Sequence, residues 1–139
     1  MNIIIVGCGR TGSAIAAQMS AEGHDTAIID LNPLAFNRLP PDYPGRLIVG
    51  TGIDEDVLHN AGIESASALV AITKGDNTNI MIGQIAKFIY RVPKVMVRIV
   101  DPKVKKFYEE KFGLSCYCPT EENPGHFIRF IKGEEQCMS

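Results

Sequence analysis

Residues 3–16 read IIIVGCGRTGSAIA, in which a short apolar run leads directly into three glycines and then into small and apolar residues typical of a helix. The glycines, Gly7, Gly9 and Gly12, have the spacing G-x-G-x-x-G. Strand, glycine-rich turn and helix in this order form the context in which that spacing predicts a dinucleotide-binding βαβ unit. The first glycine permits the turn, the second lets the backbone approach a pyrophosphate, and the third lets the helix pack close to the strand. The stretch therefore predicts a phosphate site at a helix N-terminus.

Short β-branched runs alternate with amphipathic stretches along the rest of the chain, which is typical of a parallel α/β sheet. Most of the runs are continuously apolar, as strands covered on both faces should be. The predicted strands are residues 2–6, 26–30, 46–49, 68–72 and 94–99, with a weaker sixth at 115–118. We expect an α/β, Rossmann-like three-layer sandwich, with a mostly or wholly parallel sheet of about six strands and helices on both faces.

Capping residues and glycines mark the expected helices. These are residues 11–22, a short helix after Asn32-Pro33, a helix that Asp54 caps, residues 77–90, and a helix that Asp101-Pro102 opens and that ends before Gly113. The helix over residues 77–90 carries too many apolar residues for one narrow face, so we expect it to be substantially buried, with Asp76 as its N-cap. The helix after Asp101 is expected to turn Val104, Phe107 and Tyr108 inward.

We divide the chain into a nucleotide-binding domain over residues 1–120 and a C-terminal helix and tail over residues 121–139. The stretch NPGHFIRFIKG, residues 123–133, predicts an apolar helix that packs on its own domain or on a partner subunit. The tail EEQCMS, residues 134–139, is expected to be frayed.

Length and charge exclude several classes of function. With 139 residues, the chain is long enough for one domain with a core and too short for a cofactor domain plus a substrate domain. The net charge of −2 and the 22% of charged residues provide no broad basic field, so nucleic-acid binding is not expected. No apolar run approaches the roughly 20 residues that span a bilayer, and no secretory signal is seen. We expect a cytoplasmic protein without direct membrane insertion.

The cysteines and histidines do not form a pattern that binds metal. The four cysteines, Cys8, Cys116, Cys118 and Cys137, include no C-x-x-C pair, which argues against a zinc site or a disulfide framework. Cys116 and Cys118 are interpreted as small hydrophobic residues that share one face of a strand. The histidines are far apart in sequence and share no ligand spacing; they are His24, His59 and His126.

Two charged side chains near the glycines bear on ligand choice. Asp30 ends the second predicted strand, 23 residues after Gly7, where a carboxylate can accept hydrogen bonds from ribose hydroxyls. Such a carboxylate repels a 2′-phosphate, so NAD or an adenine mononucleotide is favoured over NADP. Alternatively, Asp30 caps the helix after Asn32. Arg10 either contacts a phosphate or is a solvated surface arginine.

Polar clusters also follow the later strands. They are VGTG at residues 49–52, TKGDNTN at residues 73–79, and Arg98 with Asp101. The carboxyl ends of parallel strands form the edge at which such sheets bind ligands, so these clusters predict one site. A guanidinium at an apolar strand end needs an anion, and either Asp101 or a ligand phosphate is expected to pair with Arg98.

Hydride transfer needs an acid or base beside the substrate and a second wall that excludes water. No histidine falls on the predicted ligand edge, and Lys74 is the one plausible proton donor there. We therefore expect binding without turnover and assign no catalytic residue. The alternatives are a small NAD-dependent oxidoreductase, or a fragment of one, and a domain whose role is dimerisation alone.

Five stretches taken together carry a resemblance to a known family. They are IIIVGCGRTGSAIA, HDTAIIDLNPLAFNRL, DEDVLHNAGIESASALVAIT, DNTNIMIGQIAK and VRIVDPK, in that order. Over residues 1–120 the chain resembles the N-terminal domain of TrkA-type and RCK proteins, which regulate potassium channels and transporters. The resemblance implies a Rossmann-like domain that binds NAD(H) or an adenine nucleotide such as AMP, ADP or ATP. It also implies a homodimer or higher oligomer that acts on a membrane potassium transporter or channel subunit, at the inner face of the membrane.

The resemblance further implies a set of cofactor-binding residues. Gly7, Gly9, Arg10 and Thr11 would hold phosphates, Asp30 the ribose, Thr73 and Lys74 the middle of the ligand, and Arg98 a phosphate of this or a neighbouring subunit. The full predicted site is Gly7, Cys8, Gly9, Arg10, Thr11, Gly12, Asp30, Leu31, Thr51, Gly52, Thr73, Lys74 and Arg98. Many relatives carry an aspartate next to the adenine where this chain has Thr51 and then Gly52.

Overall fold

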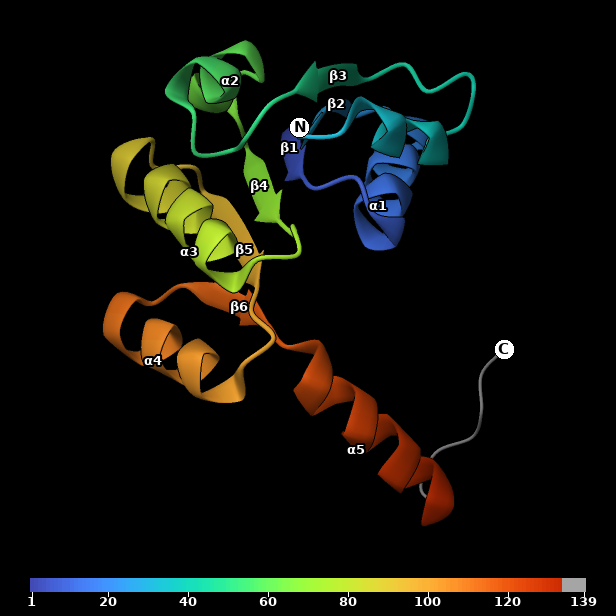
Figure 1. The fold of residues 1–139 in the computed structure, drawn as a ribbon, viewed down its shortest axis with the longest axis vertical. Helices are drawn as coiled ribbons and strands as arrows, with labels where there is room; N and C mark the ends of the chain where they lie inside the picture. The colour runs from blue at the N-terminus through green and yellow to red at the C-terminus, as the bar shows by residue number, and fades with distance from the viewer. Residues whose placement is uncertain (134–139) are drawn as a thin grey trace.

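The computed structural model describes residues 1–133, with the backbone alone for residues 120–123 and 126. Its centre is a six-stranded sheet in the order β3-β2-β1-β4-β5-β6, in which every pair of neighbouring strands is parallel (Figure 1). The strands are β1 (Asn2–Val6), β2 (Asp25–Asp30), β3 (Arg46–Val49), β4 (Ala68–Ala71), β5 (Lys94–Arg98) and β6 (Ser115–Tyr117). The strand order reverses between β1 and β4, which creates the switch point of a doubly wound sheet. The predicted fold class is confirmed.

Helices cover both faces of this sheet. They are α1 (Arg10–Ala21), the 3₁₀ helix η1 (Pro33–Arg38), α2 (Glu55–Asn60), the 3₁₀ helix η2 (Ile63–Ser65), α3 (Asp76–Gln84), its π-helical continuation η3 (Ile85–Ile89), α4 (Pro102–Phe112) and α5 (Pro119–Ile131). Alternate residues of β1 divide between two cores, since Ile3 and Ile5 pack with α1 and η1 whereas Ile4 and Val6 pack with α2 and α3. This double coverage explains why β1 is continuously apolar.

Three predicted helix starts are confirmed by side-chain caps. The carboxylate of Asp54 accepts a hydrogen bond from the Asp56 N–H at 2.8 Å, and that of Asp101 accepts one from the Lys103 N–H at 2.9 Å. Asn32 caps η1 by accepting a hydrogen bond from the Leu34 N–H. These caps satisfy N–H groups that the first turn of a helix leaves without partners.

Three expectations about α3 and α4 are wrong. Asp76 does not cap α3, because its carboxylate instead accepts hydrogen bonds from the backbone N–H groups of Val100 and Asp101. The expected long helix is not substantially buried either, since only one side of it faces the sheet and Phe88 and Ile89 are 51% and 62% exposed. Phe107 is 48% exposed and meets the ring of Phe112 edge-on at the surface instead of entering the core.

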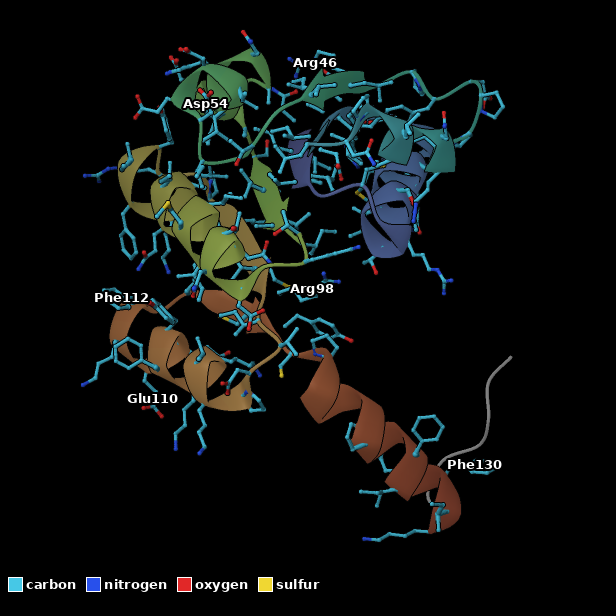
Figure 2. All side chains as sticks on the ribbon, in the orientation of Figure 1. Arg46, Asp54, Arg98, Glu110, Phe112 and Phe130 are labelled. Carbon is cyan, nitrogen blue, oxygen red and sulfur yellow. The ribbon has the colours of Figure 1, made fainter. Side chains whose placement is uncertain are left out.

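Helix α5 leads away from the sheet, and Phe130 lies on its distant part (Figures 1 and 2). The division at residue 120 remains a prediction, and the tail that we expect to be frayed lies outside the described residues. Among the helices of residues 1–133, none is long and apolar enough to cross a membrane.

Candidate functional site

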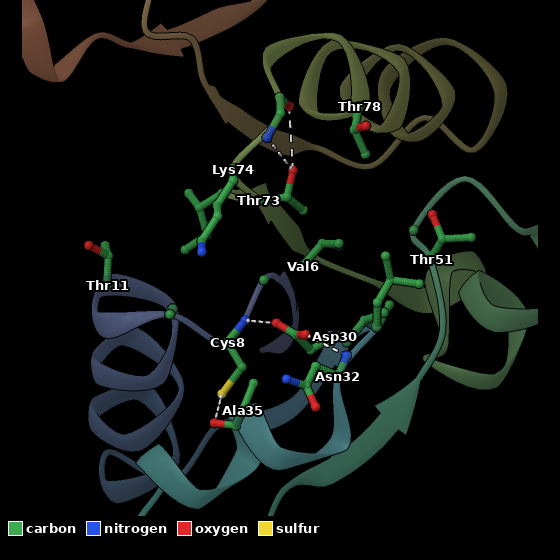
Figure 3. Close-up of a pocket in the computed structure, with 18 of the residues that line it drawn as sticks. Val6, Cys8, Thr11, Asp30, Asn32, Ala35, Thr51, Thr73, Lys74 and Thr78 are labelled. Atoms are coloured by element: carbon green, nitrogen blue, oxygen red, sulfur yellow. Dashed lines mark hydrogen bonds between the residues drawn. The ribbon is translucent and has the colours of Figure 1, made fainter.

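A cavity of about 940 Å³ opens at the carboxyl edge of the sheet, beside the switch point (Figure 3). It is within the size range of small-molecule sites. Every residue of the predicted site lines this cavity, from the glycine turn through Asp30 and Leu31 to Thr51, Gly52, Thr73, Lys74 and Arg98. The structure therefore brings together residues that five separate segments of the chain contribute.

The three glycines of the turn have different surroundings. Gly7 has φ of +112°, and a Cβ there would lie 2.8 Å from the Ile72 carbonyl oxygen. A Cβ at Gly12 would lie 1.8 Å from the Gly7 carbonyl oxygen, so α1 packs against the turn only because Gly12 has no side chain. At Gly9 a Cβ would meet no protein atom within 4 Å. Protein packing thus requires Gly7 and Gly12, whereas Gly9 faces open space.

Helix α1 starts directly after Gly9 without a side-chain cap. The N–H groups of a first helical turn lack partners within the helix and carry the positive end of its dipole. These groups and the Arg10 and Thr11 side chains lie at the cavity, so this end of α1 is suited to an anion.

Asp30 joins the glycine turn to the segment that follows β2. Its Oδ2 accepts a hydrogen bond from the Cys8 N–H and its Oδ1 accepts one from the Asn32 N–H, both at 2.8 Å (Figure 3). The alternative that Asp30 caps η1 is wrong, because the Leu34 N–H donates to Asn32 instead. Each carboxylate oxygen retains acceptor capacity for a further hydrogen bond.

Cys8 lies beneath this part of the cavity, and its thiol donates to the Ala35 carbonyl at 3.3 Å. Burial, reinforced by the negative charge of Asp30, raises the pKa of the Cys8 thiol, while Arg38 acts in the opposite direction. Cys8 is therefore a neutral, hydrogen-bonded thiol. Arg38 of η1 also lines the cavity, although it is not among the predicted site residues.

On the other side of the cavity, Arg98 does not pair with Asp101, one of the two anions expected for it. Its Nη2 donates to the Thr73 carbonyl at 2.7 Å. Asp101 does not pair with it within the salt-bridge distance among the described residues, because that carboxylate caps α4. The guanidinium has five donors, so Arg98 can bind an anion while it holds Thr73.

Asn79, which the sequence reasoning did not single out, organises this side. It is 1% exposed and forms hydrogen bonds with Thr73 and Arg98. Its signal in the sequence was a polar residue next to Ile80 on the buried face of a predicted helix. Thr78 of the same helix lines the cavity and was missed as well. Lys74 is exposed, and its side chain extends toward the α1 side in Figure 3.

A wholly parallel, doubly wound sheet with a glycine-rich turn and a polar cavity at its switch point defines a Rossmann-like domain of the nucleotide-binding type. The family model of the TrkA-N domain matches residues 3–115. The chain belongs to the TrkA-N domain family. This family is regulatory rather than catalytic, and the oxidoreductase alternative is set aside.

Individual relatives agree with this assignment. The chain is 43% identical over 109 residues to the Trk system potassium uptake protein TrkA of Streptomyces coelicolor. The aligned region covers 78% of this chain and 49% of the relative. The chain thus spans about half the length of this relative and of the TrkA homologs of Pyrococcus abyssi and Pyrococcus horikoshii that it matches.

Two solved structures share the fold. The Kef CTD of Shewanella denitrificans in an AMP-bound form has a TM-score of 0.76 at 21% identity, covering 96% of this chain and 82% of that chain. The GsuK channel bound to NAD has a TM-score of 0.72 at 16% identity, covering 91% of this chain and 23% of that chain.

Proposed function

We propose that this domain binds NAD(H) or an adenine nucleotide (AMP, ADP or ATP) without turnover, and that occupancy of the cavity regulates a potassium uptake transporter or channel. The observation that carries the proposal is the convergence of the predicted site residues on one cavity at the switch point. The AMP and NAD of the two similar structures and the potassium uptake role named for the relatives support it.

Each side of the cavity has a part in this proposal. The uncapped start of α1, with Arg10 and Thr11, holds phosphate. Asp30 accepts hydrogen bonds from ribose hydroxyls while it keeps the turn in place, and Leu31 and Thr51 lie beside the base. Thr73, Lys74 and Arg98 contact the remainder of the ligand. A ligand regulates the assembly only if it contacts one conformation better than another.

Assembly involves a second copy of the chain. Helix α5 extends away from the sheet (Figure 1), and Phe130 and Ile131 on it are 54% and 79% exposed. We propose that a homodimer or higher oligomer covers these residues, and that it acts in the cytoplasm on a membrane potassium transporter or channel subunit. An Ile131→Glu variant should shift the mass measured by light scattering toward the monomer, whereas Lys132→Glu should not. A monomeric wild-type protein contradicts this part of the proposal.

Thermal unfolding of the wild-type protein with AMP, ADP, ATP, NAD and NADH tests the binding itself. A ligand that binds the native state alone raises the unfolding temperature as its concentration increases. At least one of the five should do so in the millimolar range or below. If none does, the nucleotide-binding function is refuted.

A further inference from the structure

The cavity consists of two halves that are shaped by different means. The β1–β2 half, made of residues 7–12 and 30–32, is shaped by backbone geometry and by glycines. The β4–β5 half, made of residues 73–75 and Arg98, lies at the ends of two neighbouring strands. One side chain from α3, that of Asn79, forms hydrogen bonds with both strand ends in this half.

Asn79 uses the full hydrogen-bonding capacity of its amide on the β4–β5 half. Its Oδ1 accepts hydrogen bonds from the Thr73 N–H at 2.9 Å and from the Thr73 hydroxyl at 2.6 Å. Its Nδ2 donates to the Thr73 carbonyl at 3.0 Å and to the Arg98 carbonyl at 2.9 Å. A rotated amide would oppose the three hydrogen bonds with backbone groups, since only the Thr73 hydroxyl can either donate or accept, so the network fixes the orientation of the amide. One buried amide thus ties the end of β4 to the end of β5.

A mononucleotide and a dinucleotide are expected to occupy different parts of the cavity. A Rossmann-like sheet binds a dinucleotide across its switch point, so that the two nucleotides lie on opposite sides of it. With Asp30 on the ribose, a mononucleotide is accommodated by the β1–β2 half, and the second nucleotide of NAD extends over Thr73 and Arg98. Asn79 itself is not among the residues that line the cavity. The Asn79 amide can therefore affect the ligand through Thr73 and Arg98, the two lining residues that it holds.

We propose that Asn79 is a positioning residue that fits the β4–β5 half to a dinucleotide and thereby sets the preference for NAD over AMP. This inference rests on the proposed nucleotide binding. It concerns selectivity, which a general loss of stability would not alter, because destabilisation weakens the binding of both ligands alike.

The test is the ratio of NAD to AMP affinity in an Asn79→Asp variant, measured by calorimetry. Aspartate keeps the shape and the two accepted hydrogen bonds, but it places an oxygen opposite the carbonyls of Thr73 and Arg98. The matched control is Asn77→Asp, which adds the same charge at an exposed position of α3. We expect Asn79→Asp to weaken NAD binding about tenfold and AMP binding less than about threefold, with both affinities retained in the control.

An unchanged ratio, or equal weakening of both ligands, overturns the inference. Hydrogen exchange on the wild-type protein provides a second test that needs no folded variant: NAD should slow exchange of the Thr73 amide, and AMP should not. Equal protection by both ligands again overturns it. A wild-type protein that binds no nucleotide refutes the proposed function instead, and one that binds AMP but not NAD refutes this inference alone.

Discussion

Substituting alanine for Gly9 adds one methyl group to a cavity in which a Cβ at this position would meet no protein atom within 4 Å. Gly9 has φ of −86° and ψ of −160°, an extended conformation that alanine adopts readily. Alanine is a poorer N-cap than glycine, which destabilises the protein by about 0.5–1 kcal/mol. Alanine also lowers the conformational entropy of the unfolded chain, which stabilises the protein by a similar free energy. The free energy of unfolding should therefore change by less than about 1 kcal/mol.

Binding should respond much more strongly than stability. If a pyrophosphate contacts the Gly9 backbone, the added methyl group occupies its place, and overpacking of this kind costs about 1–3 kcal/mol. That range corresponds to a loss of affinity of about 5-fold to 150-fold. The assay is calorimetric titration with NAD and AMP, combined with urea unfolding of the same variant.

The contrast is Gly12→Ala, in which the Cβ would lie 1.8 Å from the Gly7 carbonyl oxygen. That backbone atom cannot yield as a flexible side chain would, so Gly12→Ala should lose about 3 kcal/mol or more of stability. A Gly9→Ala protein that binds both nucleotides with wild-type affinity refutes the placement of the phosphate.

Three further changes test other parts of the structure. Asp30→Asn should lower the free energy of unfolding in urea by about 1–3 kcal/mol. Asparagine has one oxygen acceptor and one NH₂ donor, so either the Cys8 N–H or the Asn32 N–H loses its partner. Unchanged stability would show that one of these hydrogen bonds is dispensable. Arg91 has φ of +55°, a left-handed conformation that is strained for arginine and free of strain for glycine, so Arg91→Gly should raise the free energy of unfolding by about 1 kcal/mol. A lower stability would mean that the Arg91 side chain contributes more than the strain costs. Burial raises the pKa of the Cys116 thiol to about 11. Alkylation of Cys116, followed by mass spectrometry, should therefore be slow at neutral pH and accelerate until the pH nears that value. Fast alkylation at pH 7 would contradict this prediction.

The sequence predicts local structure well where the interactions of a residue are with its neighbours in the chain. Asp54 and Asp101 precede amphipathic helical stretches, and both cap the helices they were expected to cap. The carboxyl-edge position of Thr73 and Arg98 follows from parallel strands alone, because every strand of such a sheet points to the same edge.

What the sequence could not predict depends on neighbours that are distant in the chain. Asp76 has the pattern of a helix cap, but its carboxylate meets the N–H groups of Val100 and Asp101, 24 and 25 residues away. Asn79 looked like one polar residue among several, and its role appears only when the ends of β4 and β5 are brought together. Phe107 has helical spacing, but spacing alone does not show how far the covering face of a helix extends.

Nuclear magnetic resonance titration of the ¹⁵N-labelled wild-type protein with NAD, and separately with AMP, tests the central claim most directly. The account predicts saturable shifts of the backbone amides of residues 7–12 and 30–32 with both ligands, and of residues 73–75 with NAD. Amides at the opposite edge of the sheet, such as those of Gly45 and Gly62, should remain unchanged. Shifts that cluster at that opposite edge, or no shifts at millimolar ligand, would contradict it.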